Sequence, residues 1–285
     1  MSSTGSTSPP LRRHLSPASE TRTTLLLIDI QRGLNTHNGY FGSERSTPDF
    51  EKNVSALLAA AREYNSSAQV RVRVSRSHGQ VEDHSTSPPP VHSASNGAPN
   101  VEEGADNDSK REPYAVEIVH VYHKSTNPLS PLHVSGTTQI DGIKFMPCAE
   151  PVTAMESSES ATLPREHVLP KSTNTAFGNA ELKEILERGR IEQLVVAGIA
   201  TDHCVTTSVR WAKDLGVVKK RPGQGERRED ERGENGTIVI LSDATACFNK
   251  GGFDAETVQK VHLASLEGEF ATVMTTNDVL AQLFG

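Results

Sequence analysis

Three side chains in this sequence have the chemistry of a nucleophilic catalyst: the carboxylate of Asp29, the amine of Lys171 and the thiol of Cys204. A thiolate can attack a carbonyl carbon, a carboxylate can carry the proton, and an ammonium group can stabilise nearby negative charge. Each residue follows a short apolar run of the kind that forms a buried strand in a parallel sheet. Because ligands bind at the carboxyl edge of such sheets, we expect the three side chains to meet there.

Cys204 lies in the most informative stretch of the chain, residues 194–216. Apolar residues 194–197 predict a buried strand, and the pattern from Asp202 predicts a helix that ends at Gly216. The first turn of a helix carries unpaired N–H groups and the positive end of the helix dipole, which both favour a thiolate. We therefore expect the thiol pKa to be lowered from about 8.5 to roughly 6. The alternative interpretation is a small apolar residue buried between a strand and a helix.

The elements that must position these side chains alternate between strand and helix. The predicted strands are 23–30, 117–122, 167–171, 194–197, 237–241 and 270–274, with 69–74 as either an extension of the sheet or part of an insertion. The main helical patterns are 50–61, 182–189, 202–216 and 254–266. In the last of these, Asp254 is the expected N-cap and Val258, Val261 and Leu266 form the apolar face. The alternation predicts an α/β fold with three α/β/α layers around a doubly wound, mainly parallel sheet.

Composition divides the chain into one domain and three polar segments. Only 35% of the 285 residues are apolar, and the deficit collects in 1–22, 75–115 and 219–236. Polar, aperiodic segments bury too little apolar surface to offset chain entropy. We therefore expect a disordered N-terminal tail at 1–22 and one domain at 23–285 with flexible insertions at 75–115 and 219–236.

Charge and hydropathy exclude several partners. The net charge is −7, and the basic residues of 219–232 alternate with acids, so no basic patch for nucleic acid is expected. No apolar run approaches the roughly 18 residues that a membrane span needs. The three cysteines are an odd number without metal-type spacing, which is typical of a reducing compartment, so we expect a cytoplasmic protein.

A polar loop, residues 123–133, follows the strand at 117–122. Loops at strand ends are common places for binding residues. Its two histidines, His123 and His133, have no Asp or Glu at a recognisable ligand spacing. Solvated or structural histidines are therefore favoured over metal ligands.

Three motifs together resemble the isochorismatase-like cysteine hydrolase family, which includes nicotinamidases, N-carbamoyl amidohydrolases and isochorismatases. They are LLLIDIQRG around Asp29, KSTNTAF from Lys171 to Phe177, and GIATDHCV around Cys204. The resemblance covers most of the chain from Thr23 onward, apart from the two insertions. It implies a triad in which Cys204 attacks a carbonyl, Asp29 takes and returns the proton, and Lys171 stabilises the thiolate and orients the carboxylate.

The resemblance also implies the surroundings of the triad. A cis peptide bond between Ile199 and Ala200 would direct the amides of Ala200 and Cys204 into an oxyanion hole. We also expect a small-molecule substrate and a homo-oligomer. The expected substrate contacts are Gln31, His123, Asn127, Phe177 and Thr201.

Two departures from the family's patterns bear on the substrate. The metal-binding nicotinamidases carry an Asp-x-His motif and a further His after the second strand, where this chain has HKSTNPLSPLH. Isochorismatases hydrolyse a vinyl ether and often lack the cysteine. We therefore expect no metal, no cofactor, and hydrolysis of a small amide, ureide or similar C–N bond through a Cys204 acyl-enzyme. The alternatives are an isochorismatase, in which Asp29 protonates a vinyl ether, and a catalytically silent member that serves as a binding module.

Overall fold

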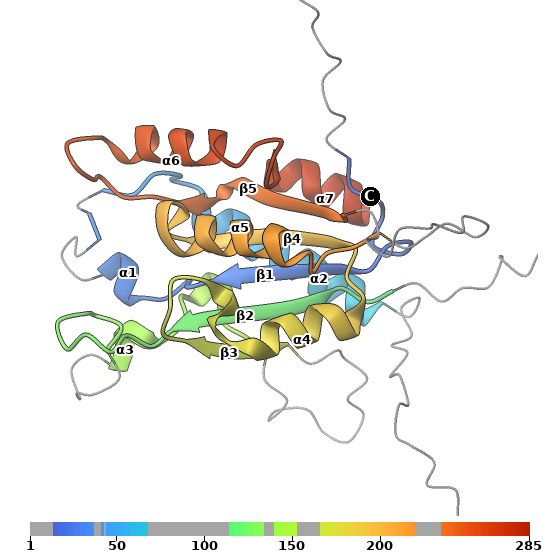
Figure 1. The fold of residues 1–285 in the computed structure, drawn as a ribbon, viewed down its shortest axis with the longest axis horizontal. Helices are drawn as coiled ribbons and strands as arrows, with labels where there is room; N and C mark the ends of the chain where they lie inside the picture. The colour runs from blue at the N-terminus through green and yellow to red at the C-terminus, as the bar shows by residue number, and fades with distance from the viewer. Residues whose placement is uncertain are drawn as a thin grey trace, which may run out of the picture.

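Six strands form one sheet in the described part of the chain (Figure 1). In chain order they are β1 (Thr23–Ile28), β2 (Glu117–His123), β3 (His167–Lys171), β4 (Gln193–Ile199), β5 (Thr237–Ala246) and β6 (Thr272–Met274). Their spatial order is β3-β2-β1-β4-β5-β6, and every neighbouring pair is parallel. The predicted α/β fold with a doubly wound sheet is confirmed, and the described sheet is parallel throughout.

The computed structural model describes residues 14–36, 41–42, 44–67, 114–133, 140–152, 166–220 and 235–285. The expected insertions at 75–115 and 219–236 lie almost wholly outside these ranges, and so does the candidate strand at 69–74. These assignments therefore stay predictions.

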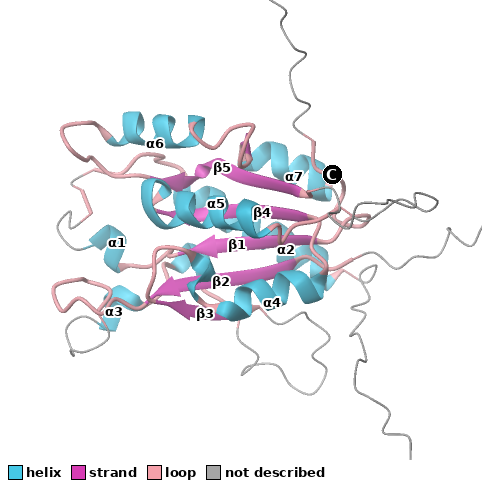
Figure 2. Ribbon diagram, viewed as in Figure 1, coloured by secondary structure: helices cyan, strands magenta, loops and turns pink. Residues whose placement is uncertain are grey.

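Helices cover both faces of the sheet (Figure 2). Side chains of α2 (Phe50–Ser66) and α7 (Thr276–Phe284) pack on one face, and those of α4 (Ala180–Gly189), α5 (Thr206–Leu215) and α6 (Ala255–Ala264) pack on the other. Two short helices, α1 (Gly33–Thr36) and α3 (Ile140–Ile143), lie at the carboxyl edge of the sheet, and 3-10 turns occupy Pro147–Ala149 and Ala176–Gly178. None of the described helices is long and apolar enough to cross a membrane.

Burial explains why two central strands are almost continuous apolar runs. All residues of β1 and β4 are buried. A strand that has a neighbour on each side and helices over both faces has no solvent-facing side, so apolar residues are favoured at every position. This is the signal from which both strands were predictable.

The folded domain begins earlier in the chain than expected. Leu15 and Ala18 are each 1% exposed and belong to the core on the α7 side of the sheet. The Ala18 amide donates to Leu283 O at 3.1 Å. Residues 14–22 are therefore part of the domain, in contrast to the disordered tail expected for 1–22, because two apolar side chains of this polar segment cover α7. The rest of that segment lies outside the described ranges.

Helix α6 and the residues after it bury only part of the predicted face, since Leu266 is 0% exposed as predicted but another position differs. Asp254 caps it as expected, since its carboxylate accepts the Thr257 amide at 2.8 Å. Val261, however, is 60% exposed, whereas Gln259 is only 3% exposed. The Gln259 amide group donates to Thr245 O at 3.1 Å and to Thr245 Oγ1 at 2.9 Å. A hydrogen-bonded polar side chain thus faces the core, while the predicted valine faces solvent.

A buried ion cluster joins β2, α2 and the segment before β3. The Glu166 carboxylate, 6% exposed, lies 2.7 Å from Arg62 Nε and 2.9 Å from His120 Nε2, and it accepts the Val152 amide at 2.9 Å. Burial alone raises the pKa of Glu166, but the hydrogen bonds from His120, Arg62 and Val152 outweigh it and bring the pKa down from 4.5 to about 2. The cluster therefore contributes to stability as long as Glu166 is ionised.

We expect Glu166→Gln to destabilise the fold at neutral pH. Because the folded-state pKa is depressed, the contribution of Glu166 is present above the unfolded pKa of 4.5 and is lost as the pH falls toward 2. A shift of this size corresponds to about 3 kcal/mol, or roughly 6–12 °C in the thermal midpoint. Thermal melts of both proteins at neutral pH and at about pH 3 measure it, and the gap between them should shrink at the lower pH. An equal gap at both pH values would contradict the assignment.

Candidate active site

The predicted catalytic residues meet at the carboxyl edge, near the centre of the sheet. The strand order reverses at β1, with β2 and β3 on one side and β4, β5 and β6 on the other. Such a reversal leaves a crevice outside the carboxyl ends of the strands, where ligands bind in open α/β sheets. Asp29 directly follows β1, Lys171 ends β3, and Cys204 lies in the turn after β4. The fold thus brings together residues that are far apart in the sequence.

A close junction between β1 and β4 sets the position of Asp29. Gly198 of β4 packs so tightly on β1 that a Cβ atom there would lie 2.2 Å from Ile28 O. Asp29 has a φ of 52°, in the left-handed region that aspartate tolerates better than most residues. Its amide donates to Val121 O of β2 at 2.8 Å. The chain therefore turns sharply after Ile28 and holds the buried Asp29 at the sheet edge.

Lys171 is the centre of the polar cluster. Its Nζ lies 2.6 Å from Asp29 Oδ2, 3.4 Å from Cys204 Sγ and 3.1 Å from His123 Nδ1, and it donates to Thr173 O at 3.0 Å. The Lys171 and Asp29 side chains are 0% and 2% exposed. A buried ammonium is costly unless it is paired, and here the carboxylate and the carbonyl provide the pairing. The arrangement holds one cation between a carboxylate and a thiol.

Cys204 does not lie in the regular helix that the sequence predicts. Residues Thr201–Val205 form a single π-helical turn, η5, and α5 begins only after it. Such turns are frequent at functional sites. Helical periodicity in the sequence is similar for both kinds of turn, so the pattern from Asp202 onward could not distinguish them.

The resting Cys204 side chain is a thiol, and the expectation of a lowered pKa is wrong. Burial is the largest cause that raises the pKa, the Asp29 charge raises it further, and Lys171 offsets only part, so the pKa of Cys204 reaches about 12. A helix terminus does not lower the pKa of Cys204, because this residue lies in a partly buried turn beside a carboxylate. The proton therefore stays on sulfur, next to a carboxylate that can accept it.

The backbone between β4 and Cys204 folds back on itself. The peptide bond that joins Ile199 to Ala200 is cis. The Ala200 carbonyl accepts the amides of His203 and Val205 at 3.0 Å and 3.3 Å. Along the chain, the Cys204 amide thus lies between the amides of His203 and Val205, which both donate to the Ala200 carbonyl.

Asp29, His123 and Cys204 also have donor atoms arranged as in a three-ligand metal site. One atom from each lies within 4.8 Å of the others, and carboxylate, imidazole and thiolate all bind zinc. Lys171 Nζ, however, contacts all three side chains, so the ammonium takes the position of a cation. Burial, and then the charge of Lys171, lowers the pKa of His123, so its ring is neutral at neutral pH.

The five expected substrate contacts have different places in the structure. His123 is a member of the cluster around Lys171. Gln31 is buried, and its side chain hydrogen-bonds the backbone N–H and C=O of His123 at 2.8 Å and 3.1 Å. Asn127 is exposed and caps a turn, Phe177 packs in the core, and Thr201 is fully buried in η5. Gln31 therefore supports the end of β2 instead of facing the crevice.

A second charged pair lies beside Cys204, and no sequence motif predicts it. Asp202 of η5 binds Lys250 Nζ, which comes from the loop between β5 and α6. The two residues are far apart in the sequence, and no motif connects them. Their contact depends on how the β5–α6 loop lies against η5.

A family model described as the isochorismatase domain matches residues 114–278. The match covers more than half of the chain and includes both Lys171 and Cys204. The chain belongs to the isochorismatase family. It is therefore a hydrolase of that family, as the sequence motifs predict. Asp29 precedes the matched region, and the fold brings it to the other two residues.

Two relatives support the assignment to the isochorismatase family. The isochorismatase family protein YrdC of Bacillus subtilis is 26% identical over 168 residues, which are 57% of this chain and 72% of that protein. The secreted isochorismatase effector Isc1 of Verticillium dahliae is 26% identical over 162 residues, which are 57% of this chain and 67% of that protein.

Solved structures of isochorismatase-family proteins share the fold. A protein of Chromobacterium violaceum assigned to the hydrolases of this family aligns with a TM-score of 0.60 and 22% identity, over 95% of this chain and 98% of that chain. A cysteine hydrolase of Pseudomonas syringae aligns with a TM-score of 0.55 and 16% identity, over 96% and 97% of the two chains. At these identities the likeness establishes the fold, and the chemistry rests on the residues of the site.

Proposed function

We propose that this isochorismatase-family hydrolase cleaves the C–N bond of a small amide or ureide through a thioester on Cys204. One observation carries the proposal: Lys171 Nζ contacts both Asp29 Oδ2, at 2.6 Å, and Cys204 Sγ, at 3.4 Å. A nucleophile, a base and a cation within reach of one another are the groups that nucleophilic acyl transfer requires.

In the first step, Cys204 Sγ attacks the carbonyl carbon and its proton passes to Asp29. A base is needed because a thiol pKa of about 12 leaves little thiolate at neutral pH. Lys171 stays protonated and stabilises the negative charge as it moves from the carboxylate to the sulfur. The carbonyl oxygen becomes an oxyanion, and we propose the amides of Ala200 and Cys204 as its hydrogen-bond donors.

The intermediate then collapses and the C–N bond breaks. Asp29 returns its proton to the leaving nitrogen, and a thioester remains on Cys204. A water molecule attacks the thioester and gives a proton to Asp29. The C–S bond breaks, and the sulfur takes that proton back, so one amide and one water yield an acid and an amine while the triad is unchanged.

Vinyl ether hydrolysis is the second candidate, because the family includes isochorismatases. That reaction needs Asp29 as an acid that protonates the substrate, and it gives Cys204 no part. A cation lies 2.6 Å from the Asp29 carboxylate and 3.4 Å from a thiol that can give up a proton, and this arrangement suits a base better than an acid. A catalytically silent binding module does not require a buried ion pair beside a thiol, so this third hypothesis is favoured least.

A panel of small amides, ureides and isochorismate tests the proposal. We expect release of ammonia or an amine from at least one C–N substrate, no turnover of isochorismate, and an acyl adduct on Cys204 in acid-quenched samples analysed by mass spectrometry. Turnover of isochorismate without hydrolysis of any amide would overturn the proposal.

We expect the activity to survive EDTA, because the Lys171 ammonium already fills the position between Asp29, His123 and Cys204. Added Zn²⁺ should inhibit, since it can bind these ligands only by displacing the ammonium. Turnover is measured before and after dialysis against EDTA, with elemental analysis of the purified enzyme. Stoichiometric zinc or iron that is lost together with the activity would contradict this prediction.

We also propose a cytoplasmic homo-oligomer. All three cysteines are free thiols, which favours a reducing compartment, although the relative Isc1 is named as secreted. Trp211 of α5 and Val261 of α6 are 47% and 60% exposed, and large exposed apolar side chains are common at subunit contacts. Cell fractionation and light scattering of the purified protein test the two parts, and a secreted protein or a monomer would contradict them.

A further inference from the structure

A second ion pair lies on the turn that carries Cys204. The Asp202 side chain is 4% exposed, and its Oδ2 accepts a hydrogen bond from Lys250 Nζ. His203 Nε2 lies 3.6 Å from the same oxygen and 2.6 Å from Lys250 Nζ. Burial alone raises the pKa of Asp202, but the Lys250 hydrogen bond and the charges of His203 and Lys250 outweigh it, so the pKa is lowered. The buried carboxylate is therefore charged, and Lys250 is its main partner beside His203 and a hydrogen bond with Cys247.

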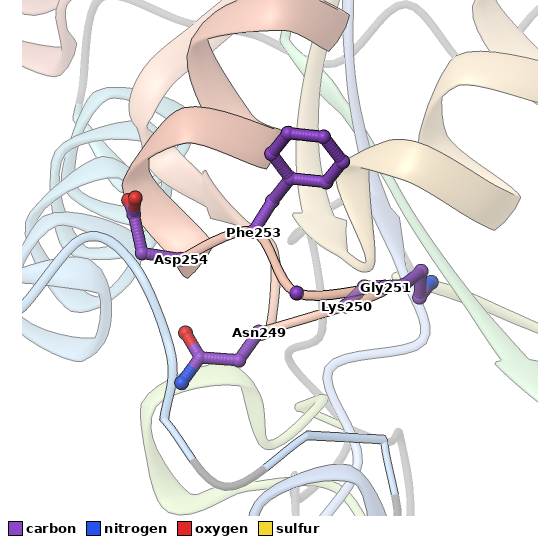
Figure 3. Close-up of a pocket in the computed structure, with 6 residues that line it drawn as sticks. Asn249, Lys250, Gly251, Phe253 and Asp254 are labelled. Carbon is purple, nitrogen blue, oxygen red and sulfur yellow. The ribbon is translucent and has the colours of Figure 1, made fainter.

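The loop that presents Lys250 is a tight turn between β5 and α6 (Figure 3). Lys250 and Phe253 exchange two backbone hydrogen bonds of 3.0 Å, and the two glycines between them have φ values of 60° and 85°. Glycine adopts these angles without steric cost, so the turn is well defined. Figure 3 shows the Lys250 side chain on the opposite side of the turn from Asn249 and Asp254. The ammonium is thus presented to η5 by a constrained piece of backbone.

Side chains of neighbouring elements anchor η5 at several atoms. From α5, Ser208 Oγ donates to Cys204 O at 2.6 Å, and Thr207 Oγ1 donates to His203 O at 2.7 Å. From the β5–α6 loop, Lys250 binds Asp202. A single π-helical turn is a local departure from regular helix geometry, and of these contacts the one with Lys250 comes from a distant part of the chain.

We propose that Lys250 is a positioning residue, which through Asp202 fixes η5 and so the place of Cys204 Sγ beside Asp29 and Lys171. Its effect on rate rests on the hydrolase function proposed above. Without Lys250, the buried carboxylate loses a charged partner, and η5 loses the contact that holds it to the β5–α6 loop, so the turn can shift. A shift of about 1 Å in a reacting group can lower a rate about 100-fold.

Kinetics of Lys250 variants give the first test. Lys250→Met removes the ammonium but keeps a long side chain, and we expect kcat to fall about 100-fold while KM changes less than about threefold. Lys250→Arg should restore most of the rate, because it restores the charge. The matched control is Lys183→Met, which breaks an exposed pair with Glu187, 45% and 50% exposed, and should leave both constants unchanged.

Alkylation of Cys204 gives a second test that needs no substrate. Iodoacetamide labelling of Cys204 is followed against pH by peptide mass spectrometry. If η5 moves, the surroundings of the thiol change, and the midpoint of the profile should shift in Lys250→Met. A loss of stability alone would lower the melting temperature without moving this midpoint. The double variant Asp202→Asn with Lys250→Met should be no worse than Lys250→Met, because both changes remove the same anchor.

The outcomes separate this proposal from the proposed function. A shifted labelling profile in a protein that hydrolyses no C–N substrate would support the positioning role and reject the hydrolase mechanism. Normal kcat and an unshifted profile in Lys250→Met, with amide hydrolysis by the wild type, would reject the positioning role. Should Lys250→Met fail to fold, Asp202→Asn, which leaves no buried charge, carries the same expectations.

Discussion

We expect Cys204→Ala to lower kcat/KM for the C–N substrate by at least about 1,000-fold, because the sulfur forms a bond that no neighbouring group can form. The substitution leaves the pair between Lys171 Nζ and Asp29 Oδ2, 2.6 Å apart, in place, so the fold should be retained. Steady-state kinetics on the substrate found in the panel measure the loss. Circular dichroism confirms that the variant is folded.

Cys148→Ala is the matched control for Cys204→Ala. Cys148 is a half-buried thiol whose pKa is raised to about 11, mainly by burial, and it lies outside the cluster around Lys171. We expect this control to keep full activity. If Cys204→Ala instead retains turnover, above all of isochorismate, the thioester mechanism is excluded and Asp29 acting as an acid becomes the better account.

The fold could be predicted because the strongest sequence signals are those of buried strands. The residues of β1 and β4 are buried without exception, so both strands show as apolar runs between polar ends. Their carboxyl ends carry Asp29 and the turn with Cys204. A parallel sheet brings such ends to one edge, and the contact of both residues with Lys171 follows from that topology.

The role of His123 could be predicted only in part from the sequence. His123 and Lys171 are register partners at the ends of β2 and β3, which explains why Nδ1 of one lies 3.1 Å from Nζ of the other. Ligand spacing along the sequence says nothing about this contact, because it is set by the pairing of two strands. The position of both residues at strand ends is the signal that could have placed the two side chains together.

The electrostatics of the site could not be predicted from local pattern. A cysteine after a strand and before a helix suggests a helix terminus, but burial and a nearby carboxylate decide the pKa of Cys204, and both come from tertiary packing. The burial of Gln259 in the core could not be predicted for the same reason, since it depends on Thr245 of β5, to which Gln259 is hydrogen-bonded. Periodicity identifies elements and leaves such long-range partners open.

We expect Asp29→Asn to increase the ionisation of Cys204 and to decrease turnover. The Asp29 carboxylate raises the pKa of Cys204 through its charge and a hydrogen bond, whereas Lys171 lowers it. Asparagine keeps the shape of the side chain and removes the charge, so Lys171 becomes the charged neighbour and the thiol pKa falls from about 12. The thiolate fraction at mildly alkaline pH therefore rises.

Turnover should change in the opposite direction, because a hydrolase needs more than a thiolate. Without the carboxylate, no group returns a proton to the leaving nitrogen or takes one from water, which is expected to lower kcat by about 100-fold to 10,000-fold. The control is Asp141→Asn, which removes an exposed carboxylate, 74% exposed, paired with Lys144, and should change neither quantity.

Two measurements on the same samples test whether Asp29 is the catalytic base. Iodoacetamide labelling of Cys204 against pH reports the thiol pKa, and hydrolysis of the C–N substrate reports catalysis. Faster labelling together with slower hydrolysis is the result that assigns Asp29 as the base. Slower labelling in Asp29→Asn would mean that the carboxylate does not suppress ionisation of the thiol. Unchanged hydrolysis would mean that another group carries the proton, and the mechanism proposed for this site would be wrong.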